Sequence, residues 1–130
     1  MMAAEKKVLI VDDEIHIVHV VAIKLRNNGF EVISAQNGRD AFELACEQKP
    51  DVIVTDFQMP VMTGLELVEK LRRQPTTKDI PVVMLTARGF AIEDEQVRDL
   101  RISEFLSKPF SPKELLKCIE DILYHEALMS

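Results

Sequence analysis

The chain of 130 residues contains no tryptophan, one tyrosine, four glycines and only two cysteines. Cys46 and Cys118 show neither CxxC spacing nor a nearby histidine, so the sequence predicts two reduced, partly buried thiols. No apolar stretch approaches the roughly 20 residues that a membrane helix needs. Residues 1–7 also lack the apolar core of a signal peptide. These absences favour a cytoplasmic protein that makes no contact with a membrane.

Positive charge is in short supply as well, because 16 basic residues face 22 acidic ones, for a net charge of −6. A nucleic-acid surface usually shows a basic stripe, and neither Lys6-Lys7 nor Arg72-Arg73 is long enough to form one. The composition therefore predicts no direct contact with nucleic acid. Hydrophobic residues make up 47% of the chain, which is enough for the core of one domain. No linker, repeat or low-complexity segment divides it.

Short apolar runs alternate with segments of helical periodicity from one end of the chain to the other. The runs predict strands at residues 8–11, 31–35, 52–56, 82–86 and 104–107. The periodic segments predict helices at residues 15–28, 39–48, 65–73 and 93–101, and a last helix from residue 111 onward. Five strands alternating with five helices through short connections predict an α/β fold with a doubly wound parallel sheet.

Local signals mark the ends of several of these helices. The first has apolar residues at three- and four-residue spacing, and Gly29 supplies a left-handed stop. Pro50 ends the second helix. The last begins with a capping box, in which Ser111 caps and Glu114 completes the pair, with Pro112 in the first turn.

Polar side chains follow four of the predicted strands. They are Asp12 and Asp13 after the first, Asp56 at the end of the third, Thr86 at the end of the fourth and Lys108 after the fifth. The carboxyl ends of parallel strands share one edge, which is where open α/β folds bind ligands. Two like charges 4 Å apart repel by roughly 4 kcal/mol at an effective dielectric near 20, so the three carboxylates need a cation or a proton. Mg²⁺ suits such oxygen ligands.

Taken singly, each of these residues also has a plain structural interpretation. An aspartate after a strand is commonly a helix N-cap, Thr86 is a β-branched strand residue, and Lys108 is a solvated surface lysine. The combination of all of them at one edge favours a chemical site.

Four segments resemble the receiver domain of two-component response regulators, the CheY-like family. They are VLIVDDE at residues 8–14, VIVTDFQMPVMTG at 52–64, VVMLTA at 82–87 and FLSKPF at 105–110. They follow the family's order over essentially the whole chain. The resemblance implies a single receiver domain over residues 1–130, without an output domain. It also implies a (βα)5 flavodoxin-like sheet with the strands in the order 2-1-3-4-5.

The resemblance also assigns roles to the residues at the strand ends. Asp56 is expected to accept a phosphoryl group from a phosphohistidine and become an acyl phosphate. Asp12 and Asp13 are expected to hold Mg²⁺, for which Mn²⁺ would substitute, together with Asp56 and the backbone carbonyl of Gln58. The remaining expected roles are a hydrogen bond from Thr86 to the phosphoryl oxygens, an ion pair of Lys108 with them, and a cis bond between Lys108 and Pro109.

The expected output is a switch rather than an enzyme's product, although the domain would assist its own phosphorylation and dephosphorylation. Thr86 would move toward the phosphoryl group and Phe105 would rotate inward, which changes the face formed by the fourth helix, the last strand and the last helix. The implied partners are a histidine kinase or phosphotransfer protein, and a downstream protein target or an output domain absent from this chain. A monomer and a phosphorylation-dependent dimer both remain open.

Two other functions are compatible with parts of the pattern. A haloacid-dehalogenase-type phosphatase also uses a strand-end aspartate with Mg²⁺, but it needs a second aspartate at the position where this chain has Gln58. A receiver-like interaction module would keep the fold without phosphorylation. The chain also departs from the family pattern: Thr63 stands where aspartate is common, and Arg101-Ile102 replaces the usual Gly-Ala, which puts the end of the fourth helix in doubt.

Overall fold

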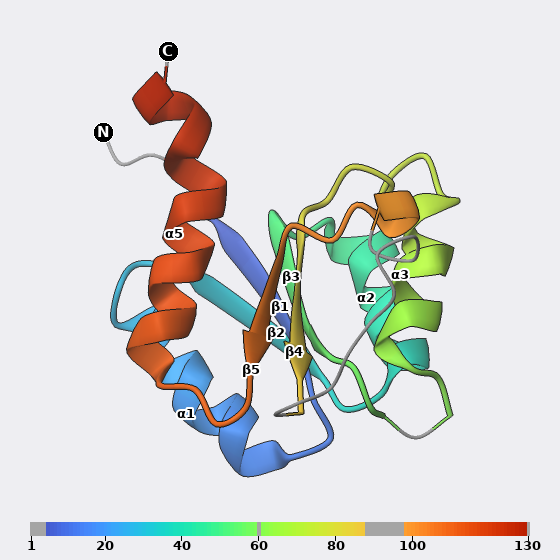
Figure 1. The fold of residues 1–130 in the computed structure, drawn as a ribbon, viewed down its shortest axis with the longest axis horizontal. Coiled ribbons are helices and arrows are strands. Elements are labelled where there is room, and N and C mark those ends of the chain that lie inside the picture. The colour runs from blue at the N-terminus through green and yellow to red at the C-terminus, as the bar shows by residue number, and fades with distance from the viewer. Residues whose placement is uncertain (1–4, 60, 88–97, 130) are drawn as a thin grey trace.

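The fold is built on one parallel β-sheet, described here from a computed structural model that covers residues 5–59, 61–87 and 98–129. Its five strands lie in the order β2-β1-β3-β4-β5 (Figure 1). They are β1 (Lys7–Val11), β2 (Glu31–Ala35), β3 (Val52–Asp56), β4 (Val82–Thr86) and β5 (Glu104–Ser107). All neighbouring strands pair in parallel. The predicted α/β class, the five strands and their order are confirmed.

Helices cover both faces of this sheet (Figure 1). On one face lie α1 (Ile15–Arg26) and α5 (Pro112–Met129), and on the other lie α2 (Gly38–Gln48) and α3 (Gly64–Arg72). The predicted helix at residues 93–101 lies mostly outside the described residues, of which 98–100 are helical. Within the described parts of the chain, no helix is both long and apolar enough to cross a membrane.

The sheet is apolar on both faces because each strand sends alternate side chains to opposite sides. In β1, Val8 and Ile10 belong to the core beneath α1 and α5, whereas Leu9 and Val11 belong to the core beneath α2 and α3. All four are fully or almost fully buried. The continuous apolar runs seen in the sequence are therefore the signature of a doubly covered sheet.

The first helix ends two residues earlier than its periodicity predicts. Its last residue is Arg26, and the chain then tightens into a turn in which the Asn28 amide donates to the Leu25 carbonyl at 3.0 Å. Gly29 follows with a φ of 90°, so the predicted left-handed stop is confirmed. Asparagine competes for backbone hydrogen bonds in turns, which explains the early end.

Capping boxes fix the starts of α3 and α5. Thr63 Oγ1 accepts from the Glu66 amide at 3.2 Å, and Glu66 accepts from the Thr63 amide at 2.9 Å. The same reciprocal pair joins Ser111 and Glu114. The predicted capping box of the last helix is confirmed, and threonine at position 63 caps its helix in place of the common aspartate.

Two arginines stabilise the turn before β5, where the chain departs from the family pattern. Arg101 itself adopts the left-handed conformation, with a φ of 54°, where the family pattern has glycine. Its guanidinium donates to the Lys78 carbonyl at 2.8 Å, while Arg72 donates to the carbonyls of Leu100 at 2.8 Å and Ile80 at 2.7 Å. These bonds hold a turn that a non-glycine residue adopts only at a cost.

Candidate functional site

The carboxyl edge of the sheet gathers the residues that the sequence singled out. Asp12 follows β1, Asp56 is the last residue of β3, Thr86 is the last residue of β4, and Lys108 follows β5. The Lys108 amide donates to the Thr86 carbonyl at 2.8 Å, which continues the pairing of β4 and β5 up to the lysine. The topology therefore brings four distant segments of sequence to one place.

Three carboxylates form the acidic centre of this edge. One oxygen from each of Asp12, Asp13 and Asp56 lies within 4.8 Å of the others. Asp12 is completely buried, Asp56 is nearly so, and Asp13 is exposed. Hard oxygen ligands in this arrangement fit a divalent cation such as Mg²⁺, which keeps several waters beside one or two carboxylates.

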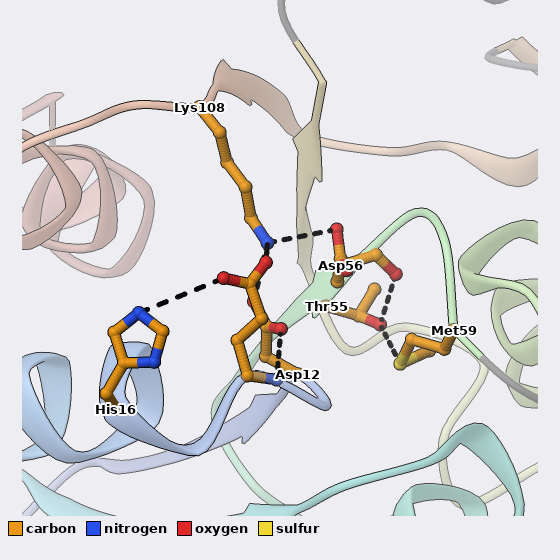
Figure 2. A network of polar contacts seen from close by, with 7 residues as sticks. Asp12, His16, Thr55, Asp56, Met59 and Lys108 are labelled. Atoms are coloured by element: carbon orange, nitrogen blue, oxygen red, sulfur yellow. Dashed lines mark hydrogen bonds and ion pairs between the residues drawn. The ribbon is translucent and has the colours of Figure 1, made fainter.

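The ammonium group of Lys108 offsets part of this negative charge. Lys108 Nζ lies 3.0 Å from Asp12 Oδ2, 3.1 Å from Glu14 Oε1 and 3.5 Å from Asp56 Oδ1 (Figure 2). The lysine side chain is only 19% exposed. The predicted lysine therefore points into the acidic cluster, and the plain interpretation of a solvated surface lysine is wrong.

The titration of the two central groups follows from this crowding. Burial, together with the negative charge of Asp12, raises the pKa of Asp56 from 3.8 to about 6, although Lys108 acts in the opposite direction. Burial acts to lower the pKa of Lys108, but its hydrogen bonds with Asp12 and Glu14, together with the negative charges of Asp12 and Asp56, leave that pKa raised. The lysine is thus held as an ammonium, and the aspartate resists losing its proton.

A polar cavity of about 280 Å³ opens above the cluster. It is lined by Asp13, Glu14, Asp56, Gln58, Ala87 and Lys108. Gln58 is exposed on its wall, where the resemblance expects a backbone ligand. The cavity has both the charge and the room for a cation together with a small anionic group.

The two residues expected to act as a switch lie on neighbouring strands. Thr86 is buried at the end of β4, one strand away from Asp56. Phe105 on β5 is half-buried against the core beneath α2 and α3, and it lines a shallow cavity of about 270 Å³. The peptide bond between Lys108 and Pro109 is cis, as the resemblance implied.

Two residues that the sequence reasoning left without a role support the site. A Cβ atom on Gly64 would lie 2.5 Å from the Asp56 carbonyl oxygen and 2.9 Å from Met84 Sδ, so only glycine fits there. Glu14 supplies the third acceptor for Lys108. The signals were present, since Glu14 continues the acidic run and Gly64 closes the loop after Asp56, but neither reveals a contact by itself.

Hydrogen bonds fix the backbone at the end of β3 and in the loop that follows Asp56. Thr55 Oγ1 donates to the Asp56 carbonyl at 3.1 Å and lies 3.9 Å from Met59 Sδ (Figure 2). The Gly64 amide donates to the Phe57 carbonyl at 2.8 Å, which closes the loop between β3 and α3. A rigid support of this kind holds the Asp56 carboxylate at a defined position.

Comparison with known proteins agrees with this geometry. The response regulator receiver domain family matches residues 8–120, and the chain belongs to this family. It is a receiver domain of two-component signalling, and its fold is that of the CheY-like proteins.

Several relatives show how far the similarity extends. The phosphate regulon transcriptional regulatory protein PhoB of Pseudomonas aeruginosa is 38% identical over 120 residues, which cover 91% of this chain and 52% of that protein. PhoB of Escherichia coli K12 is also 38% identical over 120 residues, with the same coverage of both chains. The chain therefore spans about half the length of the curated relatives it matches.

Solved structures match over most of the fold. The chemotaxis response regulator CheY4 of Vibrio cholerae superposes with a TM-score of 0.85 at 38% identity, over 92% of this chain and all of that one. The receiver domain of the Pseudomonas aeruginosa sensor histidine kinase PA1611 superposes with a TM-score of 0.82 at 27% identity, over 92% and 98% of the two chains. That structure carries a magnesium ion in its active-site cleft. The matching family is that of receivers, which leaves the phosphatase alternative without support.

Proposed function

We propose that Asp56 accepts a phosphoryl group from a phosphohistidine. The observation that carries the proposal is the cluster of three carboxylates within 4.8 Å, with the Lys108 ammonium 3.5 Å from Asp56. An Asp56 oxygen would attack the phosphorus atom, so that a P–O bond forms while the P–N bond breaks and the imidazole leaves with the electron pair. A carboxylate nucleophile divides a difficult transfer into two easier steps.

Asp12, Asp13, Asp56 and the backbone carbonyl of Gln58 would hold Mg²⁺, or Mn²⁺ in its place. When bound, the cation supplies neutralisation of the charge that builds up on the transferring group. The magnesium ion in the PA1611 receiver domain supports this assignment. The polar cavity supports it too, because Asp13, Asp56 and Gln58 line it and it is open to ions from solvent.

Lys108 and Thr86 would bind the phosphoryl oxygens once Asp56 is modified. A phosphoryl group brings up to about two negative charges, and the ammonium of Lys108 is the side-chain cation nearest to Asp56 among the described residues. The Thr86 hydroxyl would donate a hydrogen bond from the neighbouring strand. These two groups come from separate strands, so the modification would pull on both β4 and β5.

The donor would be a histidine kinase or a phosphotransfer protein that docks beside the acidic edge. A mostly apolar groove of about 590 Å³ lies there, between α1 and the loop from β5 to α5. Its lining includes His16, Ile17, Val20, Val21, Pro109 and Phe110. Ile15 is 64% exposed at the same end of α1. An exposed apolar surface beside a reactive group is typical of a protein interaction site.

The output would be a change in the face formed by the fourth helix, β5 and α5, driven by Thr86 and Phe105. Residues 1–130 would form one receiver domain, because a single sheet and its two cores extend from β1 to α5. The signal would pass through protein contacts, either to a separate target or to an output domain.

Phosphorylation in vitro tests the central step. Incubation with Mg²⁺ and a small-molecule phosphodonor is expected to add one phosphoryl mass, measured by mass spectrometry of the intact protein. Chelation of the divalent cation is expected to abolish the addition. Asp56→Ala is expected to remove it, whereas the matched control Asp99→Asn, an exposed aspartate away from the site, is expected to retain it.

The same assay decides between the proposals for this fold. A persistent modification in Asp56→Ala would refute the assignment of the acceptor. No modification of the folded wild-type protein by several donors would favour the receiver-like interaction module.

A further inference from the structure

The Lys108 ammonium contacts three carboxylates, and only two of them belong to the cluster that could hold a metal ion. Asp12 and Asp56 belong to the acidic cluster that fits a divalent cation, whereas Glu14 lies outside that cluster. The contact with Glu14, at 3.1 Å, is as short as the contact with Asp12, at 3.0 Å, and shorter than the contact with Asp56, at 3.5 Å. One of the three acceptors is therefore independent of the metal ligands.

The orientation of Glu14 shows that its carboxylate does not serve its own helix. Glu14 occupies the N-cap position of α1 but makes no side-chain capping bond there. By contrast, the Asn37 side chain caps α2, and the Thr63 side chain caps α3. The Glu14 amide instead donates to Asp12 Oδ1 at 2.9 Å, which anchors the start of α1 to the acidic cluster. The Glu14 carboxylate turns Oε1 toward Lys108 Nζ, at 3.1 Å, while its Oε2 lies 3.9 Å from His16 Nε2 on the exposed side of α1.

The pair formed by Glu14 and Lys108 also has a distinctive location. Both residues line the polar cavity above Asp56, and both line the apolar groove between α1 and the loop from β5 to α5. The ion pair thus stands at the boundary between the two cavities. The Glu14 side chain is 47% exposed, so it is accessible from solvent.

Electrostatics gives this arrangement a consequence. A divalent cation held by Asp12 and Asp56 and an ammonium 3.0 to 3.5 Å from the same two carboxylates carry like charges and share the same acceptors. Lys108 must then weaken its contacts with Asp12 and Asp56. Without another acceptor, the ammonium would either oppose the cation or leave the site for solvent.

We propose that Glu14 is a positioning residue that holds the Lys108 ammonium at the rim of the site while a divalent cation occupies the aspartate cluster. This role rests on the proposed function and extends it. Glu14 keeps the lysine within reach of Asp56, so that Lys108 is available when a phosphoryl group arrives. It acts through Lys108 and binds neither the cation nor the phosphoryl group.

A double-mutant cycle on Mg²⁺ affinity tests this role. Titration calorimetry suits a chain without tryptophan, and the variants are Glu14→Gln, Lys108→Met and the double substitution. Glu14→Gln leaves Lys108 with only the metal ligands as negatively charged partners, so Mg²⁺ is expected to bind about three- to tenfold more weakly. In the Lys108→Met background, the same glutamate substitution is expected to change the affinity by less than about twofold. A loss that persists without Lys108 would show that Glu14 acts on the cation directly and would overturn the proposal.

A second measurement observes the lysine itself. With Mg²⁺ bound, the ¹⁵N-labelled ammonium of Lys108 is expected to give a slowly exchanging NMR signal in the wild-type protein and to lose it in Glu14→Gln. An unchanged signal in the variant would count against the proposal. Glu43→Gln, which removes the same charge from an exposed position on α2, is the matched control and is expected to alter neither measurement.

The outcomes separate this inference from the function on which it rests. Failure of the folded wild-type protein to bind Mg²⁺ or to be phosphorylated would refute the proposed function. Normal binding and phosphorylation, combined with additive effects of the two substitutions, would refute the role of Glu14 alone.

Discussion

The amino edge and the carboxyl edge of the sheet differ in how many carboxylates surround each lysine. At the amino edge, Lys7 begins β1, and its amide donates to Asp51 Oδ2 at 2.7 Å. Its ammonium lies 3.1 Å from the side-chain oxygen of Gln48 and 3.6 Å from Glu31. At the carboxyl edge, Lys108 is the one cation that the described residues place against Asp12, Asp13, Glu14 and Asp56, of which it contacts three. Among these groups, the first edge sets one ammonium against two carboxylates, and the second sets one ammonium against four.

The difference separates structural charge from functional charge. The groups around Lys7 are partly exposed and paired: the Lys7 side chain is 22% exposed, and its ion-pair partner Glu31 is 51% exposed. The pKa of Asp56, by contrast, is raised to about 6 by burial and by Asp12. Natural sequences keep buried, mutually repelling carboxylates mainly at functional sites, where a bound ligand can offset the repulsion. The excess charge at the carboxyl edge is therefore a binding requirement built into the fold.

Neutralising Asp56 is expected to have the largest effect on stability. Because its pKa rises from 3.8 to about 6 on folding, the folded state binds more protons than the unfolded state between these values, and stability falls as the pH rises through that window. Without metal, Asp56→Asn is expected to be more stable than the wild type by about 3 kcal/mol at pH 7. The gain should shrink toward zero near pH 3.5. Urea unfolding at both pH values measures it, and a gain independent of pH would contradict the explanation.

Removing the space beneath Asp56 is expected to have the next largest effect. Gly64→Ala would place a methyl group 2.5 Å from the Asp56 carbonyl oxygen, which is backbone and cannot yield easily. The expected loss of stability is about 2 kcal/mol, with slower phosphorylation because the carboxylate shifts. Gly38→Ala is the comparison, since its methyl group would meet atoms of the Met62 side chain, the nearest being Cβ at 2.9 Å, and no backbone carbonyl. Chemical denaturation compares the two, and an equal loss in both would be evidence against a special role of Gly64.

Removing the Lys108 ammonium, the one cation among the four carboxylates in the described part of the chain, is expected to cost less. In metal-free buffer, Lys108→Met is expected to lose about 1 to 2 kcal/mol, between the values for buried and exposed ion pairs. Added Mg²⁺ should restore this stability, because a cation that binds only the folded state stabilises it. Thermal unfolding with and without Mg²⁺ measures both effects. A loss that Mg²⁺ leaves unchanged would mean that Lys108 acts through packing.

The corresponding change at the other edge is expected to have the smallest effect. Lys7→Met removes an ion pair whose glutamate is half exposed, so the expected loss is below about 1 kcal/mol. Mg²⁺ should not alter the loss, because Lys7 lies at the opposite end of β1 from the acidic cluster. The same thermal unfolding series provides the test, and an equal response of both lysine variants to Mg²⁺ would remove the contrast between the edges.

Most of the fold could be predicted from local patterns. Each strand was visible as a short apolar run, and the start of the last helix at Ser111 was visible as a capping box. The end of α1 was two residues wrong, because the turn through Asn27 and Asn28 depends on backbone bonds that periodicity does not contain. The left-handed Arg101 is of the same kind, since the hydrogen bonds that hold the turn join residues 23 and 28 positions apart in sequence.

The members of the site were also predictable, but their contacts were not. Asp12, Asp56 and Lys108 were identifiable because each follows a strand, and parallel topology brings strand ends together. The sharing of Lys108 between Asp12, Asp56 and Glu14 depends on distances of a few ångströms across 94 and 96 positions of sequence. The need for glycine at position 64 depends in the same way on the backbone of β3.

Sequence alone determined which residues are apolar in runs, where those runs stop, and which charges stand at their ends, because these are properties of neighbouring residues. Tertiary structure alone decided that one ammonium would meet three carboxylates and that burial would raise the pKa of Asp56. The physical reason is that Coulomb energy and desolvation depend on separation and burial in space, which arise only when the sheet is assembled.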